Sequence, residues 1–124
     1  MVPFVYRIYL TSGKAVNKME NITATELKAL LDADDNVQLI DVRQPDEFAF
    51  TKIPGAKLIP LGDILRRMDE LDDSRLAILQ CKMGGRSARA IELLKQAGYK
   101  GELKNLRGGI TAWSNEVDPK VPKY

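Results

Sequence analysis

Histidine is absent from the 124 residues of this chain, and cysteine occurs only once, as Cys81. Without histidine, neither a Cys-His nor a Ser-His-Asp catalytic arrangement can form, and a zinc site is almost excluded, so we expect no bound metal. A single cysteine excludes a disulfide within the chain, and a free thiol is typical of reducing compartments. If Cys81 is a nucleophile, backbone dipoles and Lys or Arg side chains must activate it.

The chain also lacks a strong excess of charge and a long hydrophobic run. Its formal net charge is +2, which argues against a nucleic-acid-binding surface. The apolar stretch MVPFVYRIYL is interrupted by Arg7, is too short to span a bilayer and does not have the features of a signal peptide. The sequence therefore predicts a soluble, cytoplasmic protein without a membrane or nucleic-acid partner.

The length of the chain is typical of a single domain. We interpret residues 1–21 as an N-terminal extension or linker, in which Phe4–Leu10 could form an extra strand. Residues 22–124 are predicted to form one folded domain.

Within that domain, strand patterns alternate with helical patterns. A capping box opens the first helix, because Thr23 and Glu26 can each accept a hydrogen bond from the other's backbone amide. This alternation predicts an α/β domain with a central, mainly parallel sheet of about five strands and helices on both faces. The expected strands lie within residues 37–42, 53–60, 75–80 and 102–106, and the expected helices at 23–31, from Pro45 onward, and at 64–71, 87–97 and 110–115.

The stretch LQCKMGGRSARA (residues 79–90) joins an expected strand to an expected helix. Backbone amides converge at such a junction and favour an anion, and Gly84 and Gly85 can adopt the positive φ that lets the loop curl. Lys82 and Arg86 add positive charge, so the pKa of the Cys81 thiol should be lowered. The alternative is that Cys81 is a small buried core residue.

Three charged residues lie at the end of the strand pattern VQLIDV or just after it, at the carboxyl edge of the sheet where function is expected in such folds. Arg43 and Glu47 are four residues apart and are predicted to form an ion pair that fixes the turn. Asp41 could accept hydrogen bonds from a neighbouring loop. All three are interpreted as structural support for the site.

Three stretches make the sequence resemble the rhodanese-like sulfurtransferase family over roughly Ile22 to Trp113. They are LIDVRQPDEF with IPGAKLIP, then CKMGGRSA, and finally NLRGGITAW. The resemblance implies that Cys81 carries sulfane sulfur as a persulfide and passes it to a thiophilic acceptor, with no cofactor. It also implies that the loop binds the substrate through Lys82, Met83, Gly84, Gly85 and Arg86.

Two other functions remain as alternatives. Phosphatases of the same fold use a C-x5-R loop, whereas four residues separate Cys81 from Arg86, which suits one sulfur atom better than a phosphate. A non-catalytic module that binds a partner is the other alternative, although such domains usually lose the cysteine.

The loop and the tail DPKVPKY are similar to the C-terminal rhodanese domain of adenylyltransferase–sulfurtransferase fusion proteins. This resemblance implies a ubiquitin-like sulfur carrier protein as a partner and a role in molybdopterin or thiamine biosynthesis. The sulfur donor would be thiosulfate or a cysteine desulfurase. The chain would then be either a stand-alone version or a domain excised from a larger fusion.

Overall fold

A computed structural model describes residues 19–33 and 36–124 of the chain. The strand predicted at Phe4–Leu10 and most of the predicted linker lie outside the described residues. Five parallel strands form one sheet in the order β2-β6-β5-β3-β4. The strands are β2 (Asn21–Ile22), β3 (Gln38–Asp41), β4 (Lys57–Leu58), β5 (Ala77–Gln80) and β6 (Leu103–Leu106).

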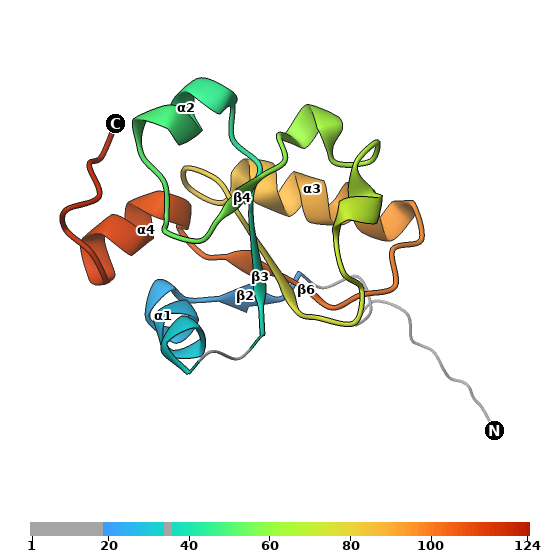
Figure 1. The fold of residues 1–124 in the computed structure, drawn as a ribbon, viewed down its shortest axis with the longest axis horizontal. Helices are drawn as coiled ribbons and strands as arrows, with labels where there is room; N and C mark the ends of the chain where they lie inside the picture. Colours follow the sequence, from blue (N-terminus) through green and yellow to red (C-terminus); the bar gives the residue numbers. More distant parts are fainter. Residues whose placement is uncertain (1–18, 34–35) are drawn as a thin grey trace.

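Helices cover both faces of this sheet, as the sequence predicts (Figure 1). On one face, Leu27 of α1 and Trp113 of α4 pack against Leu39 and Ile78 of the sheet. On the other face, helix α3 packs against the alternate residues of the same strands. The helices are α1 (Ala24–Asp32), α2 (Pro45–Phe50), α3 (Gly85–Gln96) and α4 (Gly109–Glu116).

Local signals in the sequence set several of these boundaries. The predicted capping box is present, because Thr23 N donates to Glu26 Oε1 at 2.9 Å and Glu26 N donates to Thr23 Oγ1 at 3.1 Å. Pro45 begins α2, where its missing N–H and fixed φ are compatible with a first helical turn. Gly98 follows α3 with φ +88°, which ends that helix.

The helix predicted over residues 64–71 is replaced by two short 3₁₀ helices, Leu61–Asp63 and Met68–Glu70. Arg67, which directly precedes the second 3₁₀ helix, has φ −112° and ψ 16°. These angles differ from helical values, so the two short helices do not join. Ile64 and Leu71 are nevertheless buried. The prediction of a helix over this segment is therefore wrong, although the residues at its two ends are buried.

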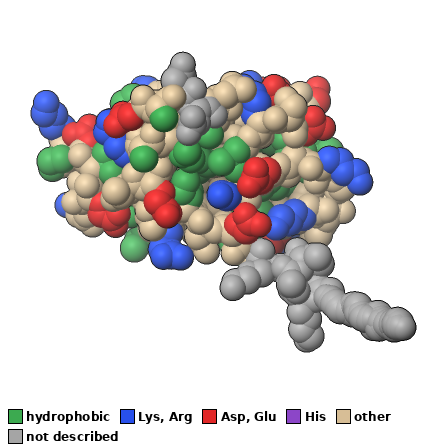
Figure 2. Space-filling model, turned by 90° about the horizontal axis from the view of Figure 1, so that it is seen from below, with side chains coloured by type: hydrophobic (Ala, Val, Ile, Leu, Met, Phe, Trp, Pro, Cys, Tyr) green, Lys and Arg blue, Asp and Glu red, His purple; other side chains and the backbone are tan. Residues whose placement is uncertain are grey.

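The face of the molecule seen from below in Figure 2 carries hydrophobic side chains near its middle, bordered by both acidic and basic ones. Neither charge sign dominates that face, in keeping with the small net charge. Among the described residues, no helix has the length and apolar character needed to cross a membrane.

Candidate active site around Cys81

Cys81 directly follows β5, and helix α3 begins four residues later at Gly85. Gly84 caps that helix with φ +110°, in the left-handed region that favours glycine. Gly85 does not have a positive φ, and a side-chain atom added to it would lie in open space. Only the first of the two loop glycines therefore provides the backbone freedom expected of both.

Hydrogen-bond donors converge on the sulfur of Cys81. Gly84 N lies 3.1 Å from Sγ, Ser87 N 3.5 Å and Ser87 Oγ 3.4 Å. Burial acts to raise the pKa of this thiol, but hydrogen bonds from the hydroxyl and amide of Ser87 and from the amides of Gly84 and Met83 outweigh it and lower the pKa. The cysteine is only 1% exposed, yet its surroundings favour the thiolate.

The carbonyl groups of the loop are held by the start of α4. Ile110 N donates to Cys81 O at 2.9 Å, and Thr111 N donates to Lys82 O at 3.1 Å. Gly109 makes this approach feasible, since a Cβ at that position would lie 2.4 Å from Cys81 O. The second glycine pair of the sequence thus supports the loop as well as forming a turn, and its contacts leave the loop amides to face the sulfur.

Asn105, on the neighbouring strand β6, links the loop to the sheet. Its Nδ2 donates to Gly84 O at 3.2 Å, and Ser87 Oγ lies 2.6 Å from its Oδ1. Sequence reasoning missed both Ser87 and Asn105 as site residues. A hydroxyl in the first turn of the helix after Cys81 was a visible signal for Ser87, whereas the contact of Asn105 depends on strand order.

Glu47 pairs with Arg86 and not, as predicted, with Arg43. The guanidinium of Arg86 donates to the two carboxylate oxygens of Glu47 at 2.6 and 2.9 Å. This bidentate pair, against the effect of partial burial, lowers the pKa of Glu47 to about 2. The pair connects α2 to the first turn of α3, so it closes the loop from the side.

Arg43 turns inward instead and is fully buried with Asp41. Its Nε donates to Asp41 Oδ1 at 2.9 Å and its Nη2 to Oδ2 at 2.7 Å, while Nη2 also donates to Thr51 O at 2.6 Å. The Asp41 carboxylate thus accepts hydrogen bonds from its own turn rather than from a neighbouring loop. A bidentate buried pair of this kind fixes the backbone after β3, so Asp41 and Arg43 lie beside the site without reaching Cys81.

Tyr124 is a further residue that sequence reasoning missed. Its hydroxyl donates to Glu47 Oε2 at 2.7 Å and accepts from Arg43 Nη1 at 2.8 Å. The ammonium of Lys82 lies 4.6 Å from the centre of its ring, and Met83 next to it is 66% exposed. Of the predicted loop residues, Lys82, Met83 and Arg86 therefore line the outside of the loop.

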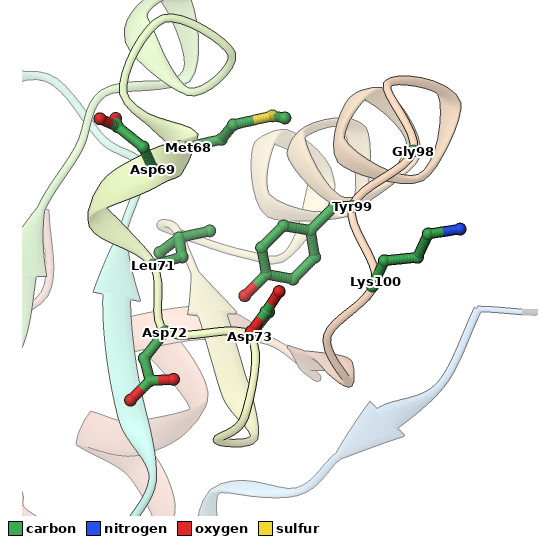
Figure 3. Close-up of a pocket in the computed structure, with 8 residues that line it drawn as sticks. All are labelled: Met68, Asp69, Leu71, Asp72, Asp73, Gly98, Tyr99 and Lys100. Carbon is green, nitrogen blue, oxygen red and sulfur yellow. The ribbon is translucent and has the colours of Figure 1, made fainter.

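A cavity of about 440 Å³ lies elsewhere, at the amino ends of β5 and β6 (Figure 3). Asp73, Tyr99 and Lys100 contribute to its wall, and each of them precedes β5 or β6 in the chain. The Cys81 loop lies at the opposite, carboxyl ends of these strands. The cavity is therefore separate from Cys81.

In the described part of the chain, no three acidic, His or Cys side chains gather in a way that could hold a metal ion.

Comparison with known proteins identifies the family to which this architecture belongs. The sequence matches the family described as "Rhodanese-like domain" over residues 23–116. The probable adenylyltransferase/sulfurtransferase MoeZ of Mycobacterium tuberculosis is 39% identical over 109 residues, which cover 86% of this chain and 28% of MoeZ. The chain thus spans well under half the length of that relative. The putative sulfurtransferase YtwF of Bacillus subtilis is 36% identical over 103 residues, covering 83% of this chain and 98% of YtwF.

Solved structures agree with these relatives. A rhodanese-like domain protein from Staphylococcus aureus superimposes with a TM-score of 0.73 and 33% identity, covering 86% of this chain and 99% of that one. A thiosulfate sulfurtransferase from Pseudomonas aeruginosa gives a TM-score of 0.75 and 30% identity over 82% of this chain and 20% of that one. The relatives named as sulfurtransferases support a sulfurtransferase function in general, and the chain belongs to the family of rhodanese-like domains.

Proposed function

We propose that this protein is a sulfurtransferase that carries sulfane sulfur as a persulfide on Cys81. The observation that supports this most strongly is the convergence of the Gly84 amide and of the Ser87 amide and hydroxyl on Cys81 Sγ, at 3.1 to 3.5 Å. These donors stabilise a negatively charged sulfur without a general base, which fits a chain that has no histidine.

The reaction with thiosulfate is a displacement at sulfur. The Cys81 thiolate attacks the outer, sulfane sulfur of thiosulfate, a new S–S bond forms, and the bond to the sulfite sulfur breaks with release of sulfite. The product is a persulfide anion on Cys81, whose negative charge takes the place of the thiolate charge. An acceptor such as cyanide then attacks the outer sulfur, leaves as thiocyanate and restores the thiolate.

In this scheme the residues of the loop bind the donor and hold the persulfide. The amides of Met83, Gly84 and Ser87 face the reacting sulfur, and the positive charges of Lys82 and Arg86 attract an anionic donor. Arg86 is committed to Glu47 by two hydrogen bonds, whereas Lys82 has no carboxylate partner among the described residues. Lys82 is therefore the loop cation best placed to meet the sulfonate group of thiosulfate.

The physiological partner is proposed from the relatives. MoeZ and the adenylyltransferase and sulfurtransferase MOCS3 of Drosophila ananassae, 37% identical over 93 residues, combine adenylyltransferase and sulfurtransferase in their names. We propose that this domain delivers sulfur to an adenylated ubiquitin-like carrier protein, and that its donor is thiosulfate or a cysteine desulfurase. Molybdopterin or thiamine synthesis would use such a product.

Steady-state kinetics of thiocyanate formation from thiosulfate and cyanide test the proposal. Parallel lines in double-reciprocal plots are expected, because sulfite leaves before cyanide reacts, and Cys81→Ser should abolish turnover while keeping the fold. Turnover by Cys81→Ser equal to wild type would contradict the persulfide mechanism. Hydrolysis of a phosphotyrosine analogue in place of sulfur transfer would favour the phosphatase alternative.

A further inference from the structure

The side chain of Tyr124 contacts Lys82 of the Cys81 loop through its ring and, through its hydroxyl, the Glu47 carboxylate that binds Arg86. The hydroxyl donates to Glu47 Oε2 at 2.7 Å, and the same carboxylate receives both hydrogen bonds of Arg86. The ring lies 4.6 Å from the ammonium of Lys82, within the range of a cation–π interaction. Among the described side chains, only Tyr124 is linked to both cations, to Lys82 directly and to Arg86 through Glu47.

The tail that carries Tyr124 is anchored to the core. Val121 is buried in the core on the side of the sheet that α1 and α4 cover, and its carbonyl accepts a hydrogen bond from Ser114 Oγ of α4 at 2.6 Å. The ring of Phe50, at the end of α2, meets the Tyr124 ring edge to face, with 6.0 Å between centroids. Figure 1 accordingly shows the C-terminus beside α2. The tyrosine is therefore held on both sides rather than resting loosely on the surface.

The surroundings of the hydroxyl, above all its partial burial, favour the protonated form. Burial raises the pKa of Tyr124, the guanidinium of Arg43 acts against it, and Glu47 acts in the same direction as burial, with a net rise. The phenol thus keeps its proton at neutral pH and donates it to Glu47. Its oxygen simultaneously accepts from Arg43 Nη1 at 2.8 Å, so the hydroxyl joins a rigid buried pair to the more exposed Glu47–Arg86 pair.

We propose that Tyr124 is a positioning residue for the reaction at Cys81, which fixes Arg86 through Glu47 and Lys82 through its ring. Arg86 directly precedes Ser87, whose amide and hydroxyl lie within 3.5 Å of Cys81 Sγ, and a cation at that position adds to the stabilisation of the thiolate to an extent that depends on its distance. A side chain that holds Arg86 and Lys82 in place therefore adds to the acidity that the Ser87 and Gly84 donors give the thiol, and it keeps the anion-binding mouth ordered. This inference rests on the proposed function, since it assigns Tyr124 a role at the sulfur-carrying cysteine.

The pH dependence of Cys81 alkylation by iodoacetamide tests this inference on the full chain. Because the chain has one cysteine, the modification rate reports a single thiol and requires no sulfur donor. In Tyr124→Phe we expect the midpoint to rise by about half a unit, which slows alkylation about threefold below the midpoint. Tyr124→Leu, which also removes the ring from Lys82, should shift it further and raise the KM for thiosulfate more than it lowers kcat.

Tyr99→Phe is the matched control, because its hydroxyl is buried without a hydrogen-bond partner in the described chain and lies at the opposite end of the sheet (Figure 3). Its alkylation profile should superimpose on that of wild type. If the profile of Tyr124→Phe also superimposes on wild type, even with a lower melting temperature, Tyr124 has only a structural role and the inference fails. A wild type that forms no thiocyanate, with Tyr124→Phe still shifted, would overturn the proposed function but not the positioning of the thiolate.

Discussion

At the scale of single residues, Cys81 combines two properties that the sequence presents as alternatives. It is buried among the apolar side chains of one core cluster, and its sulfur also accepts hydrogen bonds from Gly84 and Ser87. Burial alone would raise the pKa of the thiol and make it inert. The donors reverse that effect, so a cysteine at this position is both enclosed and acidic.

The hydroxyl of Ser87 has one proton and three acceptors within reach, namely Cys81 Sγ, Gly84 O and Asn105 Oδ1. When the thiolate forms, sulfur becomes the charged acceptor and should attract that proton. In Ser87→Ala the pKa of Cys81 is therefore expected to rise by about one unit. Thiolate absorbance near 240 nm, followed during a pH titration, measures it.

The same substitution at Ser74, whose hydroxyl binds Asp72 on the surface, provides the control and should leave the titration unchanged. An unchanged midpoint in Ser87→Ala would mean that the backbone amides alone set the acidity of Cys81.

At the scale of elements, the loop owes its shape to three neighbours: the end of β5, the start of α3 and the start of α4. Gly84 and Gly109 occupy left-handed backbone conformations where the loop turns and where α4 approaches it. The sequence predicted the strand–loop–helix junction, because an apolar run, two glycines and a helical pattern follow one another. It could not predict the approach of α4, which joins residues nearly thirty positions apart.

The two loop glycines, Gly84 and Gly85, separate the effect of a left-handed backbone conformation from the effect of adding a side-chain atom. Gly84→Ala places a Cβ on a residue with φ +110°, and the expected strain is about 1–3 kcal/mol. We expect this variant to lose most sulfur-transfer activity, since the Gly84 amide would leave its place 3.1 Å from Cys81 Sγ.

Gly85→Ala adds the same atom in open space within a helix, so stability and activity should be retained or slightly raised. Unfolding curves and thiocyanate assays of both variants measure the difference. Equal losses in the two would contradict the assigned backbone roles.

At the scale of the whole molecule, the alternation of strands and helices was enough to predict a parallel sheet covered on both faces. Buried runs such as VQLIDV and RLAILQ carry that information locally. Pairings between distant residues were not predictable in the same way. Arg43 was assigned to Glu47 because the two are close in sequence, but the buried carboxylate of Asp41 holds its side chain inward and leaves Glu47 to Arg86.

Gln80, the last residue of β5, is fully buried, and neither polar atom of its amide has a hydrogen-bond partner among the described residues. A buried amide without partners reduces stability, and replacing it by an apolar group of similar size relieves the cost. Gln80→Met is therefore expected to raise the free energy of unfolding by about 1–2 kcal/mol. Urea titration gives this quantity.

The control is Gln38→Met on β3, because the amide of Gln38 donates to the carbonyl of Asp72 and accepts from the backbone N–H of the same residue. Loss of these bonds should lower the free energy of unfolding. If Gln80→Met is destabilised as much as Gln38→Met, the amide of Gln80 serves the fold and the interpretation is wrong.

The central claim is that one sulfur atom resides on Cys81 during the reaction, and intact-protein mass spectrometry tests it most directly. Wild type and Cys81→Ser would be incubated with thiosulfate, weighed, treated with cyanide and weighed again. We predict that wild type alone gains the mass of a single sulfur atom and loses it to cyanide. A wild type that gains no sulfur from either thiosulfate or a cysteine desulfurase, or a Cys81→Ser variant that gains as much, would contradict the account.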